Sequence, residues 1–193
     1  MHRSWRLAAP ILTGIALAAI AAVTPARANE FVAKQWEIGG DLVHTTYDND
    51  STIADTFSFA VRAGYAIRPR HMLELHLNFQ SADQDIKDSS ESFSIERYTV
   101  NYIGNIKTKK PDSKYIGYGL FGLGIMNVDG NGGKDSTTLF RAGGGTRYFF
   151  TKKIALRVEG ALAHFHGDGE AIPRRSYFDF DFGVGVSFLV GGS

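Results

Sequence analysis

The chain has 193 residues, with 22 glycines, 5 prolines and no cysteine, and its formal net charge is +1. This charge excludes a protein that holds nucleic acid by bulk positive charge, and the lack of cysteine excludes disulfides and thiolate chemistry. Hydrophobic residues make up 44% of the chain, which is too many for a disordered protein. The high glycine content disfavours a helix-rich fold, since glycine weakens helices.

The first residues have the layout of a secretory signal peptide. A basic start precedes an apolar run over residues 7–23, and an Ala-Arg-Ala cleavage motif ends at Ala28. We predict a signal peptide over 1–28, cleavage between Ala28 and Asn29, and one domain over 29–193. An uncleaved anchor is the alternative, but the apolar run is slightly short for a membrane-spanning helix.

The first half of the remaining chain predicts four strands, because apolar and polar residues alternate with a period of two. In the first strand Trp36 and Ile38 oppose Glu37, and in the fourth Tyr98 and Val100 oppose Thr99. The predicted strands cover residues 34–43, 56–67, 71–81 and 94–105.

The second half predicts four more strands. The last is the clearest, because Phe178, Phe180 and Phe182 alternate with Asp179 and Asp181. Both faces of residues 115–127 are apolar or glycine, so no register is assigned to that strand. These strands cover residues 114–127, 138–150, 153–165 and 177–189.

The connections between predicted strands alternate between long acidic and short basic segments. The long connections cover 44–55, 82–93, 128–137 and 166–176, and the short ones cover 68–70, 106–113 and 151–152. This alternation is typical of membrane barrels with long outer loops and short periplasmic turns. The sequence therefore predicts an all-β fold, an eight-stranded antiparallel up-and-down transmembrane β-barrel.

The distribution of large rings predicts which face of the sheet is inside. An eight-stranded barrel interior is just wide enough to be filled by side chains, so the many Phe and Tyr rings would overfill it. We expect the rings to face lipid and the charged face to form a paired lumen network, which favours a plug over a charge-lined pore. A secreted soluble barrel with the rings inside is the alternative. The expected network consists of Glu37, Asp41, Arg62, Glu74, Arg97, Arg141, Arg147, Arg157, Glu159, Asp179 and Asp181.

Several short segments give the chain a resemblance to a known family. They are Trp36-Glu37-Ile38-Gly39-Gly40, Tyr115-Ile116-Gly117-Tyr118-Gly119, Gly143-Gly144-Gly145-Thr146-Arg147-Tyr148-Phe149 and Ala155-Leu156-Arg157-Val158-Glu159. The chain resembles small eight-stranded outer-membrane β-barrel proteins, the group of the outer-membrane protein A barrel domain and the X and W types. The resemblance implies location in the cell outer membrane, insertion by the barrel-assembly machinery, and contact with outer-membrane lipid and lipopolysaccharide. It also implies a monomer without a cofactor.

Four segments resemble chemical sites. His164 and His166 loosely resemble the His-x-Ser segment of a barrel enzyme that deacylates lipid A, but the only nearby hydroxyl is Ser176, across a loop. The acidic turns at 48–50 and 129–131 do not complete a calcium loop. The glycines at 143–145 lack the Lys-Ser/Thr pair of a phosphate-binding loop.

The predicted function is therefore non-enzymatic, in envelope structure or in surface interaction through four acidic outer loops. A narrow channel for small solutes is the first alternative, and a lipid A-modifying enzyme is the second. Divalent cations that bridge the loop acids to lipopolysaccharide phosphates are a further hypothesis.

Overall fold

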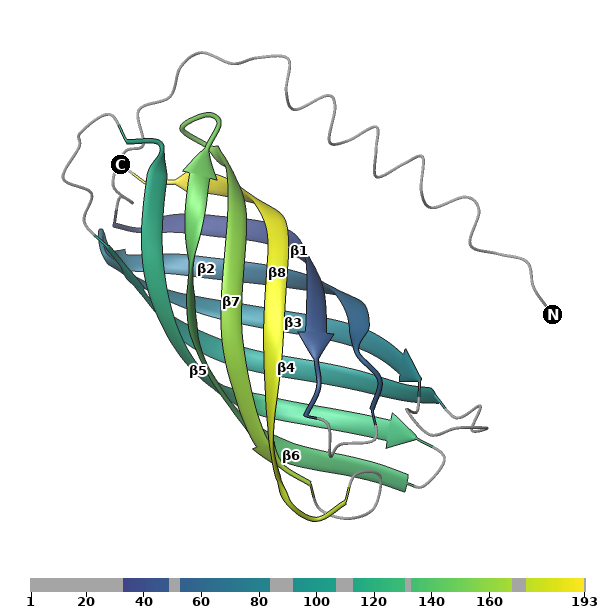
Figure 1. Cartoon of the computed structure of the whole chain (residues 1–193). Helices are drawn as coiled ribbons and strands as arrows, with labels where there is room; N and C mark the ends of the chain where they lie inside the picture. Colours follow the sequence, from purple (N-terminus) through teal and green to yellow (C-terminus); the bar gives the residue numbers. More distant parts are fainter. Residues whose placement is uncertain are drawn as a thin grey trace, which may run out of the picture.

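The computed structural model describes residues 33–48, 53–83, 92–106, 113–130, 133–167 and 173–192. Eight strands close into a barrel, and the described chain begins and ends at the same end of it (Figure 1). The strands are β1 (Gln35–Thr46), β2 (Thr56–Arg68), β3 (His71–Asp83), β4 (Ser92–Asn105), β5 (Tyr115–Gly130), β6 (Gly133–Phe149), β7 (Ile154–His166) and β8 (Ser176–Gly191).

Every strand pairs antiparallel with its sequence neighbour, and β1 pairs with β8 to close the barrel. The closing seam runs from Gln35 opposite Gly191 to Thr46 opposite Phe180. The eight-stranded, up-and-down, all-β prediction is confirmed. In the described part of the chain, no helix is long and apolar enough to cross a membrane.

One predicted connection is wrong. The segment 128–137 was expected to be a long acidic loop, but β5 reaches Gly130 and β6 starts at Gly133, and these two residues are paired. Asp135 is 3% exposed and lies on the inner face of β6. Inward-facing and outward-facing side chains alternate around it as in any strand, so β5 and β6 pair as one long hairpin as far as Gly130 and Gly133.

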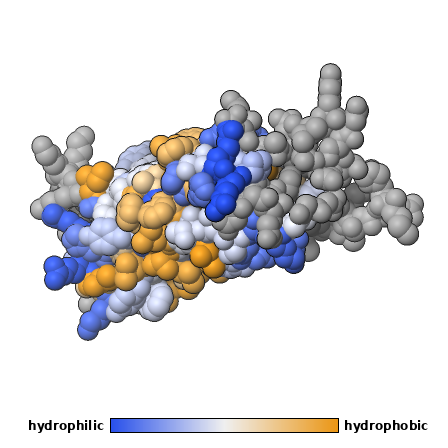
Figure 2. All heavy atoms as spheres, turned by 90° about the horizontal axis from the view of Figure 1, so that it is seen from below, coloured by the Kyte–Doolittle hydropathy of each residue, from blue (hydrophilic) through white to orange (hydrophobic). Residues whose placement is uncertain are grey.

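The outer wall of the barrel is apolar. Phe57 is 65% exposed and Phe178 is 61% exposed, which a water-soluble barrel would not allow around its whole wall. Figure 2 shows apolar side chains gathered across the middle of one face, with hydrophilic residues toward both ends. The rings therefore face outward, as predicted, and the soluble alternative with the rings inside is wrong.

Pairing with β4 and β6 fixes the register of β5, which the sequence left open. Tyr115, Phe121 and Leu123 face outward, whereas Tyr118 and Met126 are buried in the interior. A strand that is apolar on both faces thus contributes rings to the wall and apolar groups to the core.

Candidate functional site

The interior contains a charged layer between two apolar layers. All eleven residues of the expected network lie inside, and none is more than 7% exposed. Near the short turns the buried apolar residues are Ala66, Met72, Ile103, Ile116, Tyr118, Leu120, Phe149, Ala155 and Leu189. Near the other end they are Tyr47, Ile53, Ala82, Ile95, Met126, Val128, Leu139, Ala163, Phe165 and Tyr177. Both ends of the charged layer are thereby shielded from bulk water.

Arg157 on β7 is the centre of the charged layer. Its guanidinium forms ion pairs with Glu74 at 2.5 Å, with Glu37 at 3.7 Å, and with Glu159. The side chains of Arg157 and Glu159 share a face because they are two residues apart on one strand. Glu37 also pairs with Arg147 at 2.8 Å, across 110 positions in the sequence. One cation is therefore surrounded by three carboxylates from three strands.

A second chain of ion pairs extends from Glu159 toward the other end of the barrel. Arg141 bonds Glu159 at 2.8 Å and approaches Asp181 at 3.5 Å. Arg97 bonds Asp181 at 3.2 Å and Asp179 at 2.6 Å. These contacts make one continuous path of alternating charge along the lumen.

Arg62 and Asp41 form a separate buried pair between β2 and β1. Arg62 also donates to the Ser187 hydroxyl at 3.2 Å. Each of the eleven residues therefore takes part in at least one ion pair, as burial of a charge requires.

Neutral side chains that sequence reasoning missed complete the network. The Tyr118 hydroxyl donates to Glu159 at 2.7 Å and accepts from Arg157 at 2.6 Å, and its ring lies under Arg147 and Arg157. Gly145 makes room for this ring, because a Cβ there would lie 2.5 Å from the hydroxyl. In the sequence, the only sign of this role is a tyrosine between two glycines. Without the register of β5, the sequence does not show that this tyrosine faces the lumen.

Other neutral side chains donate hydrogen bonds to two of the carboxylates. Asn101 donates to Glu74 at 3.2 Å, and Thr45 donates to Asp181 at 2.8 Å. Gln80 donates to Thr45 at 3.0 Å and also bonds Tyr47. Hydrogen bonds of this kind offset part of the cost of removing the charges from water. The arrangement fills space and fixes side chains, and it leaves the charged groups little freedom to bind a solute.

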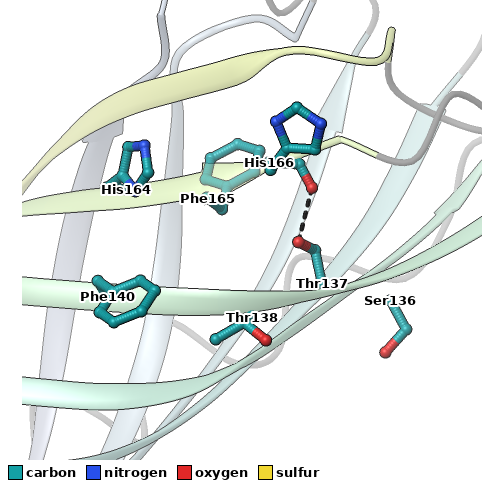
Figure 3. A pocket seen from close by; sticks show the side chains of 7 residues that line it. All are labelled: Ser136, Thr137, Thr138, Phe140, His164, Phe165 and His166. Carbon is teal, nitrogen blue, oxygen red and sulfur yellow. Dashed lines mark hydrogen bonds between the residues drawn. The ribbon is translucent and has the colours of Figure 1, made fainter.

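The structure places the histidine segment on the outer wall beside a cleft between β6 and β7 (Figure 3). His164 contacts the ring of Phe178, and the His166 Nδ1 lies 3.3 Å from the Ser176 hydroxyl. Ser176 is therefore closer than the sequence suggested. A serine nucleophile also needs an oriented histidine, and within the described ranges no carboxylate is recorded in an ion pair with His166.

The acidic turns have structural partners in their described parts. The Asp48 carboxylate accepts from the Phe178 amide at 3.2 Å, and Asp129 pairs with Lys134 at 2.7 Å. Asp50 and Asn131 lie outside the described residues. Within the described ranges no cluster of three potential metal ligands occurs. The glycines at 143–145 continue a strand and open no helix.

A closed antiparallel barrel with an apolar outer wall and a charged interior defines the class of outer-membrane β-barrels. The family model described as outer membrane protein beta-barrel domain matches residues 13–188, and the chain belongs to this family. The chain is thus a protein of the cell outer membrane, where lipid surrounds it.

The chain is 27% identical over 192 residues to outer membrane porin F of Pseudomonas fluorescens. The match covers 93% of this chain and 55% of that protein, so the chain spans about half the length of this relative.

Similar solved structures show the same fold. Neisserial surface protein A has a TM-score of 0.62 at 16% identity, over 79% of this chain and 96% of that one. The N-terminal β-barrel domain of Pseudomonas aeruginosa OprF has a TM-score of 0.55 at 16% identity, over 82% of this chain and 99% of that one.

Proposed function

We propose that this barrel is a closed, non-enzymatic component of the outer membrane that serves envelope structure or surface interaction through its outer connections. The burial of the ion-pair network supports this proposal most directly. Arg147 and Glu37 are fully buried, and Arg157 and Glu74 are each 1% exposed. Water therefore has almost no access to the middle of the lumen.

The balance of charge in the lumen supports a plug rather than a selective pore. A pore that selects ions presents unpaired groups of one sign to a hydrated path, whereas here cations and carboxylates contact each other directly. The apolar layers at both ends add a second barrier to water. A narrow channel remains the second candidate function, because one relative is named a porin.

Planar-bilayer recording of the refolded protein separates the plug from the channel. We expect no unitary conductance steps from the inserted wild-type barrel, because its lumen side chains exclude water. Heat-modifiable gel mobility of the same sample verifies folding, and a heat-unfolded sample controls for residual detergent. Reproducible ohmic steps that depend on folded protein would contradict the proposed plug and support the channel.

We also propose how the barrel reaches the outer membrane. Residues 1–28 act as a signal peptide removed before Asn29, and the barrel-assembly machinery inserts residues 29–193 as a monomer. The long outer connections then face lipopolysaccharide. Two observations support this course: the basic, apolar and Ala-Arg-Ala layout of the leader, and the closed barrel, which leaves no strand edge for pairing with a second chain.

A further inference from the structure

An apolar groove lies on the outer wall, at the end of the barrel that carries the short turns. It crosses β5, β6 and β7 and has a volume of about 350 Å³. Aromatic rings form much of it, because Tyr148 contacts Tyr115 at 4.9 Å and Phe150 at 5.1 Å between ring centroids. The full lining is Tyr115, Thr146, Tyr148, Phe150, Leu156 and Val158.

Three lysines adjoin this groove. Lys114 precedes Tyr115, and the exposed Lys152 and Lys153 follow Phe150 by two and three residues. Around them the described stretches 113–128 and 136–158 contain no acidic residue. This corner of the barrel, formed by the groove and Lys114, Lys152 and Lys153, therefore combines an apolar groove with three basic side chains that have no acidic neighbour along these two described stretches.

Hydrogen bonds hold the backbone of Lys114 and Lys153 beside the groove. The Thr151 hydroxyl accepts hydrogen bonds from the Lys153 and Ile154 amides at 3.1 and 3.0 Å. On the other side, the Phe149 amide donates to the Lys114 carbonyl at 2.8 Å. The turn and the start of β5 thus stay beside the rings.

We infer that this corner binds an anionic glycerophospholipid of the periplasmic leaflet. One acyl chain occupies the groove between the rings, and the phosphate lies among the lysine ammonium groups. Short turns face the periplasm in outer-membrane barrels, and basic residues beside a membrane-facing cleft attract anionic headgroups. A zwitterionic lipid would bring its own cation toward the three lysines, so the site prefers a net negative headgroup.

A row of three glycines lies on the outer wall next to the groove. Gly119, Gly144 and Gly160 lie side by side on β5, β6 and β7, two positions further along each strand's outer face than Gly117, Thr146 and Val158. No side chain projects from these three positions toward lipid. Beside Gly119 a Cβ would meet only the Gly143 carbonyl oxygen, at 3.9 Å, whereas the Phe180 ring lies beside Gly160.

Native mass spectrometry of the folded barrel tests the inference, with dioleoylphosphatidylglycerol and dioleoylphosphatidylcholine as competing probes in mixed micelles. We expect the wild type to retain one phosphatidylglycerol in preference to phosphatidylcholine. The double variant K152Q/K153Q should lose this preference by roughly 5- to 25-fold, since each lysine near a phosphate layer contributes about 1 kcal/mol, or a factor of about five. T146F should lower retention of the lipid without changing charge, because its ring fills the groove.

Two matched variants make the test specific. R68Q/R70Q removes the same charge at the β2–β3 turn, outside the groove, and should retain the preference. A63F adds the same ring to the outer wall of β2 and should also behave as the wild type. Equal retention of both lipids by the wild type would overturn the inference, as would equal losses in the lysine and arginine pairs. A protein dimer that occupies the groove in place of lipid would overturn it too.

Discussion

Replacing Arg157 by methionine is expected to destabilise the folded barrel by about 3–5 kcal/mol, because the change leaves buried carboxylates without their shared cation. Arg157 is 1% exposed and pairs with Glu37, Glu74 and Glu159. Urea titration in lipid vesicles, read by the gel mobility of folded and unfolded protein, measures the free energy of unfolding.

An exposed arginine outside the lumen supplies the control. Arg174 is exposed outside the strands, and R174M should change the free energy of unfolding by less than about 0.5 kcal/mol. R157M/E74Q should recover part of the loss, since Glu74 has its only described ion pair with Arg157 and the second change removes the carboxylate that R157M leaves unpaired. A change in R157M no larger than that in R174M would show that the lumen network does not stabilise the fold.

A positive charge on the middle of the outer wall is expected to cost about 2–4 kcal/mol. Leu123 lies near the centre of β5 and is 48% exposed on the lipid-facing side. We therefore expect L123R to lower the free energy of unfolding by this amount in the same urea titration, because the guanidinium must enter hydrocarbon.

The cost of an added arginine should depend on depth in the membrane. Tyr115 lies at the end of the same strand and also faces outward, so Y115R should cost only about 0–1 kcal/mol. L123A separates the effect of lost apolar contact from that of charge. Equal costs for L123R and Y115R would indicate that the wall does not cross a bilayer.

The sequence predicted the strands and the faces because a period of two survives in almost every segment. In β8 each phenylalanine faces out and each aspartate faces in, and no tertiary information is needed to see it. Where both faces of a strand have the same polarity, the period of two does not indicate which face is inside. This is why the register of β5 stayed open and why the polar β5–β6 hairpin, with its inward Asp135, resembled a loop.

The sequence indicates which charged residues face the lumen, but it does not indicate which of them form ion pairs with each other. Alternation alone assigns Arg147 and Glu37 to the inner face, whereas their contact depends on how far the strands are staggered around the barrel. The role of Tyr118 depends on the same stagger. The apolar layers at both ends were missed because their members, such as Met72 and Leu189, lie among polar inward-facing neighbours.

Spin labelling along β8 tests most directly the claim that rings meet lipid while charges fill the lumen. The chain has no native cysteine, so single cysteines at Phe182, Val184 and Val186 can be compared with Gly183 and Ser187. We expect labels at the first three positions to collide with oxygen dissolved in lipid. Labels at the other two should collide little with oxygen or with a water-soluble nickel chelate. The reverse pattern, with lipid access at Gly183 and Ser187, would contradict the account.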